Sequence, residues 1–151
     1  MAEAENPGDT LAITLNDDAF TNNSNASWSG TGTEDELKIT VTDELDTSIT
    51  TTYTVKVNVL GSLTVVSAAG TNTGDTAITV TPDAAASDIY KYKVADDVTA
   101  VDYDDDLSTW TTWDGSADIT AASGKKITVV ECTSAGKARK VGSATVVAAA
   151  E

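Results

Sequence analysis

A short acidic segment holds the side chains best suited to bind a metal ion. Asp102, Asp104 and Asp106 recur at alternate positions, and carboxylate oxygens are the hard ligands that Ca²⁺ takes. The segment lacks the turn glycine and the distal glutamate of an EF-hand loop. Two interpretations stay open, a calcium site and a solvated acidic loop, and the sequence favours the solvated loop.

Three aromatic residues near that segment could bind a sugar. Trp110, Trp113 and Tyr103 lie within a short stretch of chain, and exposed rings would form a flat platform on which a sugar stacks. A small β-sandwich also needs large side chains to fill its core. The sequence favours the core over the ligand platform for these rings.

Catalytic chemistry has little support in the residue types present. The chain contains no histidine, so Ser-His and Cys-His arrangements are impossible. It has no Gly-Lys-Ser/Thr phosphate loop and no Gly-x-Ser-x-Gly elbow. The single cysteine, Cys132, lies in a valine-rich segment, where we expect a small buried hydrophobe. The sequence therefore predicts a protein that is not an enzyme, with no catalytic residues and no cofactor.

The charge of the chain argues against two classes of partner. Twenty-four acidic residues stand against nine basic ones, which gives a net charge of −15 at pH 7. Such a field repels phosphate backbones and anionic lipids, so we expect no nucleic-acid partner and no membrane partner. Residues 1–7 lack the basic start and apolar stretch of a secretory signal. We therefore expect the chain to be made and folded in the cytoplasm.

The elements that position these residues should be strands. Threonine accounts for about one residue in six, and β-branched residues fit pleated strands better than helices. In residues 52–59 the apolar side chains fall on odd positions, which predicts a strand with one buried and one solvated face. In residues 90–94 the same alternation should point the tyrosines inward and Lys91 and Lys93 outward.

One expected strand does not alternate simply. Within residues 126–132, Glu131 falls on the same face as Ile127 and Val129. Either Glu131 lies beyond the buried part of the strand, or a β-bulge changes the face that it occupies.

Short fragments occur twice along the chain. A Gly-Asp-Thr opening, a Trp-x-Gly step and a Thr-Val-Val closing appear in both halves. The matched pairs are residues 8–15 with 74–80, Trp28-Ser29-Gly30 with Trp113-Asp114-Gly115, and residues 63–69 with 144–150. Matched ends around a matched middle indicate tandem copies of one β module.

The repeat and the turn-rich stretches between short strands predict an all-β fold. We expect two tandem small antiparallel β-sandwich modules of immunoglobulin-like type. The expected boundaries are an N-terminal module at 1–69, a linker at 70–73 and a C-terminal module at 74–151. The second module has about twenty more residues before its Trp-x-Gly step. The first module is therefore either a stripped sandwich or a smaller β-fold.

The second half resembles a known kind of module. The resemblance rests on five segments, residues 78–82, 90–94, 110–115, 118–121 and 136–142. Together they are similar to the immunoglobulin-like β-sandwich module found in phage virion proteins and in surface proteins of Gram-positive bacteria. These motifs mark a fold and not an activity.

The resemblance implies a structural role. A short acidic chain of two β modules looks like a capsid decoration or accessory virion protein of a bacteriophage. By that analogy residues 1–69 would attach to the capsid or another virion protein, in many copies, and residues 74–151 would be displayed. The expected location is the virion, and a host cell-surface glycan is a possible further partner.

Two other functions stay open. One is a carbohydrate-binding or adhesion module of a bacterial surface, which predicts an exposed tryptophan that responds to cell-wall glycan. The other is a self-assembling tail or surface-filament subunit, which predicts that the isolated chain polymerises.

Overall fold

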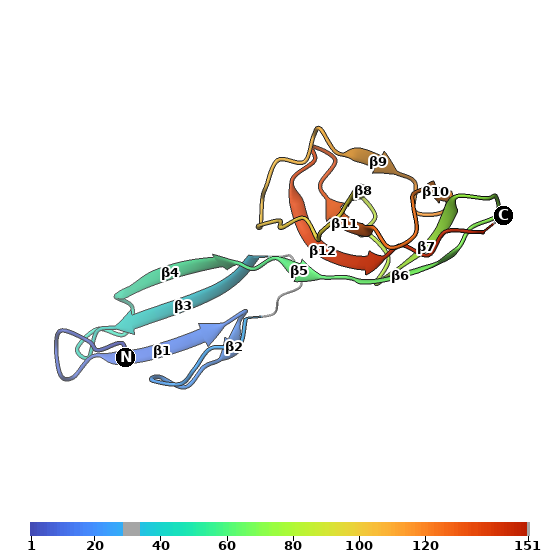
Figure 1. The fold of residues 1–151 in the computed structure, drawn as a ribbon. Helices are drawn as coiled ribbons and strands as arrows, with labels where there is room; N and C mark the ends of the chain where they lie inside the picture. The colour runs from blue at the N-terminus through green and yellow to red at the C-terminus, as the bar shows by residue number, and fades with distance from the viewer. Residues whose placement is uncertain (29–33, 151) are drawn as a thin grey trace. The chain divides into compact units, whose positions relative to one another are not determined.

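The computed structural model describes residues 1–28 and 34–150, and every regular element within them is a β-strand (Figure 1). The predicted all-β class is confirmed. It follows from the abundance of threonine and valine, whose branched side chains suit extended backbone. The described ranges contain no helix that is long and apolar enough to cross a membrane.

Two compact units divide the chain, the first ending at Val59 and the second beginning at Leu60. This boundary lies earlier than the predicted linker at 70–73. Those residues instead form the turn between two paired strands of the second unit, β6 (Thr64–Ala69) and β7 (Asp75–Thr81). The correction has a simple cause, since β6 is paired with β7 along its whole length.

The first unit is one antiparallel sheet with the strand order β2-β1-β3-β4. Its strands are β1 (Thr10–Leu15), β2 (Asp18–Ala19), β3 (Glu34–Thr42) and β4 (Thr50–Asn58). Asn16 and Asp17 join β1 to β2 with φ values of 52° and 66°, a conformation that these two residue types tolerate better than most. This single sheet is the smaller β-fold of the two alternatives that the sequence leaves open.

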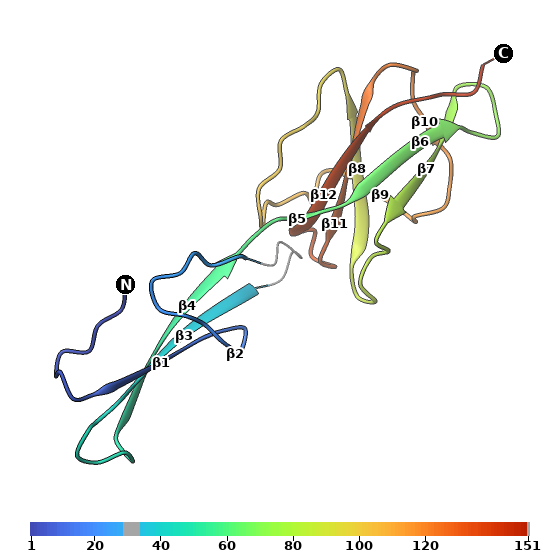
Figure 2. The same ribbon diagram turned by 90° about the horizontal axis from the view of Figure 1, so that it is seen from below.

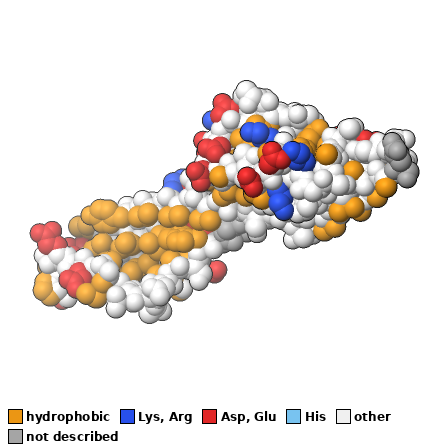
Figure 3. All heavy atoms as spheres, in the orientation of Figure 1, with side chains coloured by type: hydrophobic (Ala, Val, Ile, Leu, Met, Phe, Trp, Pro, Cys, Tyr) orange, Lys and Arg blue, Asp and Glu red, His pale blue; other side chains and the backbone are white. Residues whose placement is uncertain are grey.

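Alternating residue types give this sheet one apolar face. The register sets apolar side chains opposite one another across β1, β3 and β4, as in the row Ile13, Ile39 and Tyr53. Figure 3 shows hydrophobic side chains in rows over the first unit. The other face is polar and includes the ion pair of Lys56 with Glu34 at 2.7 Å.

The second unit is a β-sandwich of two sheets, with the strand orders β10-β7-β6 and β5-β12-β11-β8-β9. Figure 2 shows β6 and β7 of the smaller sheet alongside one another. The core between the sheets contains the buried residues Ile78, Trp113, Ile119, Ile127 and Val129. The strands not yet given are β5 (Gly61–Ser62), β8 (Ile89–Ala95), β9 (Thr111–Trp113), β10 (Ile119–Thr120), β11 (Lys126–Cys132) and β12 (Ala138–Thr145).

The chain passes from one sheet to the other within residues 61–69. β5 pairs in parallel with β12, and β6 then joins the smaller sheet. The N–H of Leu63 donates to the carbonyl of Val141 at 2.8 Å. This brings two backbones so close that a Cβ at Gly142 would lie 2.3 Å from the carbonyl oxygen of Leu63. Glycine is therefore required there by close approach.

The larger sheet is also covered on its outer face. Lys91 lies on this face with 6% exposure, so the expectation that its ammonium group points to solvent is wrong. Its Nζ donates to the carbonyl oxygens of Ser108 and Trp110 and to Thr112 Oγ1. The apolar residues buried on the same side are Leu107, Val130, Cys132 and Ala138.

Glu131 is buried within β11, with 1% exposure, and does not lie beyond the covered part of the strand. Lys140 on β12 places its Nζ 2.9 Å from both carboxylate oxygens. A bulge does occur in the β11–β12 pairing, but it falls between Glu131 and Cys132. The ion pair is therefore what makes a carboxylate acceptable at this position.

The repeated fragments do not mark two copies of one fold. Residues 63–69 contain β6 and residues 144–150 include the end of β12, so both closing fragments belong to the second unit. Ser29 and Gly30 of the first Trp-x-Gly step lie outside the described residues. The first unit has one sheet where the second has two.

Candidate functional site

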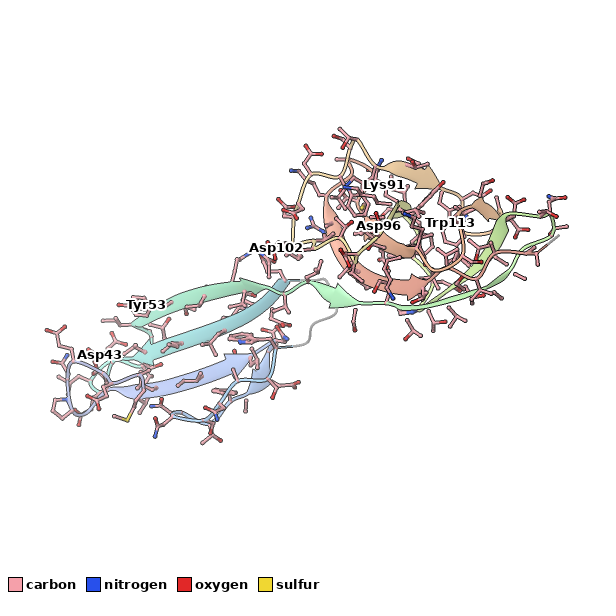
Figure 4. The ribbon with its side chains drawn as sticks, viewed as in Figure 1. Asp43, Tyr53, Lys91, Asp96, Asp102 and Trp113 are labelled. Atoms are coloured by element: carbon pink, nitrogen blue, oxygen red, sulfur yellow. The ribbon has the colours of Figure 1, made fainter. Side chains whose placement is uncertain are left out.

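The acidic segment of the second unit finds its partners within the protein. Asp104 accepts a hydrogen bond from Arg139 Nη1 at 3.1 Å. Asp106 accepts one from the backbone N–H of Ser108 at 2.9 Å, which lowers the pKa of that carboxyl. The backbone N–H of Asp102, labelled in Figure 4, donates to Asp105 Oδ2 at 2.8 Å. Over residues 1–28 and 34–150, no three acidic, histidine or cysteine side chains are grouped so that they could hold a metal ion.

Trp113 is placed in the core of the sandwich, with 6% exposure. Its Nε1 donates to the carbonyl of Ala117 at 2.7 Å, and its ring centroid lies 5.7 Å from that of Tyr90. Figure 4 shows the side chain inside the second unit. A ring held in this way has no free face on which a ligand could stack.

Trp110 and Tyr103 are half-buried, and each has a cation beside it. Lys93 Nζ lies 5.7 Å from the Trp110 ring centroid, and the Arg139 guanidinium carbon lies 4.6 Å from that of Tyr103. Among the described residues, the ring pair that the structure forms is Tyr90 with Trp113. The structure therefore does not stack the three rings that the sequence places close together.

An open hollow of about 440 Å³ lies beside Trp110. Its lining includes Lys93 and the hydroxyl-bearing residues Thr109, Thr111 and Thr120. One partly exposed indole, several hydroxyl groups and one ammonium group are the kinds of groups that can stack on and hydrogen-bond a polar ring.

Cys132 is fully buried in the cluster on the outer face of the larger sheet. Burial raises the pKa of its thiol to about 11, and the nearby Lys91 opposes the shift. A thiol with so little thiolate at neutral pH is a poor nucleophile.

The apolar face of the first unit is a feature whose exposure the sequence does not reveal. None of the apolar residues described in this unit is buried. Tyr53, labelled on β4 in Figure 4, is 60% exposed, and Val55 on the same strand is 49% exposed. Period-two alternation predicts the apolar face but carries no information on what covers it.

Two hollows lie over this face. The larger, of about 460 Å³, is lined by Ile13, Leu37 and Ile39 of the sheet and by side chains of residues 20–25. The smaller, of about 320 Å³, lies beside Tyr53. Segments within residues 1–9 line both hollows, and segments within residues 20–25 line the larger one, so these parts of the chain cover the sheet only in part.

Comparison with protein families gives one match that covers more than half of the chain. Residues 68–149, which span most of the β-sandwich, match the family described as S-layer protein SbsC C-terminal domain. No curated protein matches the chain. The predicted virion location is therefore wrong, because the matching family is that of a surface-layer protein.

Two solved structures that match this chain are both of the S-layer protein SbsC. The crystal structure of the S-layer protein SbsC, domains 7, 8 and 9, is 16% identical with a TM-score of 0.50. The match covers 99% of this chain and 56% of that chain. The structure of surface layer protein SbsC, domains 4–9, is 17% identical with a TM-score of 0.49, and covers 99% and 29%. At 16% identity the first of these two matches shows a likeness of fold alone.

Proposed function

The chain belongs to the family of S-layer protein SbsC C-terminal domains, and we propose that it is a non-enzymatic building block of a surface layer on a bacterial cell. In this proposal many copies assemble side by side, and no cofactor takes part. The proposal replaces the phage capsid with copies of the chain itself as the partner. It keeps the structural role that the resemblance implies.

The observation that carries this proposal is the family match over the β-sandwich. The sandwich has the features that a structural subunit needs. Its two sheets enclose one core, a second buried cluster lies on the outer face, and a buried ion pair links β11 to β12. A closed fold of this kind can be repeated many times without exposing its interior.

The two units divide the work in this proposal. The first unit makes contacts between copies, because its apolar sheet face is covered only in part. The second unit is presented by the layer. A sheet with no buried apolar residue gains stability by mass action when a neighbouring copy binds to its folded form.

Electron microscopy of cells tests the proposal. Antibodies raised against the whole chain are applied to intact cells of the source bacterium, with a deletion strain as the control. We expect gold label over the cell surface in a regular array, and no label on the deletion strain. Label confined to the cell interior, or found on phage particles instead of cells, would overturn the proposal.

A second candidate function has one observation in its favour, the hollow beside the half-buried Trp110. We propose that this hollow binds a cell-wall glycan by stacking on the indole. The test is a fluorescence titration with cell-wall polysaccharide, using Trp110→Phe and, as the control, Trp28→Phe in the first unit. The spectrum should shift in the control and not in Trp110→Phe, and a wild-type spectrum that does not respond rejects glycan binding.

A further inference from the structure

The longest open edge of the first unit belongs to β4. This strand has nine residues, Thr50–Asn58, and lies at the end of the sheet. Its hydrogen-bonded neighbour is β3, and no turn or loop hydrogen bond of the described chain reaches it. All but one of its residues are exposed. Every second residue of an edge strand points its N–H and C=O groups outward, where they are free to pair with another strand.

β4 has little of what usually protects an edge, since its single charged residue is Lys56. It contains no proline, and its pairing with β3 continues from Glu34–Asn58 to Thr42–Thr50 without a bulge. The opposite edge of the same sheet, β2, has only two residues. In the second unit the edge strand β6 is shorter, with six residues, and its Ser67 Oγ accepts a hydrogen bond from Val147 N–H at 2.9 Å. β4 is therefore the longest of these edge strands, and it has little protection against pairing with another strand.

Resting on the proposed surface layer, we propose that β4 pairs antiparallel with β4 of a second copy of this chain. The two four-stranded sheets then join into one sheet of eight. The contact is two-fold symmetric, so each copy offers the same strand to the other.

Charge favours a second copy at this place. The chain carries a net charge of −15, and two copies repel each other over most of their surface. The only charged residue of β4 is Lys56. Two acidic chains that meet along this strand therefore bring no carboxylate of β4 against one another.

The side-chain pattern selects a register centred on Thr54. Tyr53 then lies opposite Val55 of the other copy, which is a favourable pair of an aromatic and a β-branched side chain. Lys56 lies opposite Thr52. A shift that sets Lys56 opposite Lys56 is disfavoured by like charges. The apolar faces of the two sheets become continuous, because a shift by an even number of residues keeps each side chain on its own face.

The contact is small, and this sets the choice of test. A strand of nine residues is about 30 Å long, and pairing along one edge buries less than the roughly 1,000 Å² in total that a stable complex needs. A single pair is therefore weak in free solution, and many such contacts hold a layer together by avidity. A covalent trap detects such a pair where gel filtration would not.

Disulfide trapping of the whole chain tests the pairing. Thr54→Cys sets two thiols opposite one another at the two-fold axis, within the Cα separation that a disulfide accepts. The native Cys132 is fully buried and does not compete. The matched control is Ala19→Cys, at an exposed position on the opposite edge. Under mild oxidation Thr54→Cys should give at least ten times more disulfide-linked dimer, and equal yields from the two variants would overturn the proposal.

A charge swap at Thr52 tests the register. In the Thr54→Cys background, Thr52→Glu faces Lys56 of the other copy and should raise the dimer yield several-fold, although it adds negative charge to both chains. Thr52→Lys should lower the yield by a similar factor. The same yield in both variants would overturn the register. Regular surface label without β4 trapping would overturn the pairing alone, whereas trapping without surface label would overturn the surface layer alone.

Discussion

Removal of Lys140 from the buried ion pair should destabilise the second unit strongly. The Glu131 carboxylate lies between Tyr90 on β8 and Lys140 on β12, and Lys140 supplies two hydrogen bonds of 2.9 Å. In Lys140→Met the carboxylate keeps the long hydrogen bond from the backbone N–H of Ala85, at 3.4 Å, but loses its cation. The neighbouring Asp88 adds repulsion when it is ionised, and burial and the charge of Glu131 raise the pKa of its carboxyl.

The magnitude follows from the cost of an unpaired buried charge. Breaking one partner of a buried pair typically costs about 3–5 kcal/mol, whereas replacing both partners with apolar groups is often neutral or stabilising. The second unit has roughly 90 residues, for which 1 kcal/mol corresponds to about 4–8 °C in Tm. We therefore expect Lys140→Met to melt at least about 12 °C lower, and Glu131→Leu/Lys140→Met to regain most of the loss.

Thermal and urea unfolding, both followed by tryptophan fluorescence, measure the change in Tm and in the free energy of unfolding. A Trp28→Phe background removes the indole of the first unit, so that Trp110 and Trp113 report on the second. The control is Lys125→Met, which breaks the exposed pair with Asp96 and should cost under about 1 kcal/mol. If Lys140→Met costs no more than this control, or if the double variant is less stable than Lys140→Met, the reasoning about the buried charge is refuted.

Three further predictions concern other parts of the chain. Gly142→Ala places a Cβ 2.3 Å from the Leu63 carbonyl oxygen and should cost about 1–3 kcal/mol, read as a lower urea midpoint, and an unchanged midpoint would contradict the close approach. The pKa of Asp114 is lowered, first by the backbone N–H of Ala117 and then by that of Ser116. Its contribution is present above pH 3.8 and is lost as the pH falls through the lowered pKa. Asp114→Asn should therefore lower Tm at pH 7, with a difference that shrinks as the pH falls below 3.8, and a difference that grows on acidification would contradict the assignment. In hydrogen exchange, β4 amides should exchange orders of magnitude faster than those of β11, because β4 is exposed and β11 is buried, and equal protection would show that β4 is covered.

Alternation in the sequence predicts the strands well but not their cover. Residues 52–59 predict a half-buried strand, and the structure forms β4 over Thr50–Asn58 with its apolar side chains on one face. That face is only partly covered, because the first unit has no second sheet to pack on it. Period two reports which side chains share a face, whereas burial depends on segments that are distant in the chain.

The same limit explains the errors at Lys91 and Glu131. Alternation assigns Lys91 to the outer face correctly, since it pairs with Val130 of the second buried cluster. It misses the segment around Ser108 and Trp110 that covers this face and supplies carbonyl oxygens to the ammonium group. Covered on both faces, β11 buries residues of both parities, and a charged residue there requires a partner such as Lys140 that no local pattern reveals.

The candidate sites also show which features a local sequence pattern predicts and which depend on other knowledge. The sequence favours the core for Trp113, where the structure buries it, whereas the preference for a solvated loop over a calcium site at Asp102, Asp104 and Asp106 stays a prediction. The motifs that the second half shares with immunoglobulin-like modules identify a fold, and folds serve many proteins. A location on a virion therefore did not follow from those motifs, and the family match was needed to correct it.

Symmetry places a demand on any layer built from this chain. A two-fold contact through β4 closes on itself, because each copy uses the same edge and none is left over. Pairing through β4 alone therefore gives dimers and cannot extend in two dimensions. A layer needs a second, different contact, made by another surface of the chain. Variants that block β4 should therefore remove one of the two contacts of an array without unfolding the sandwich.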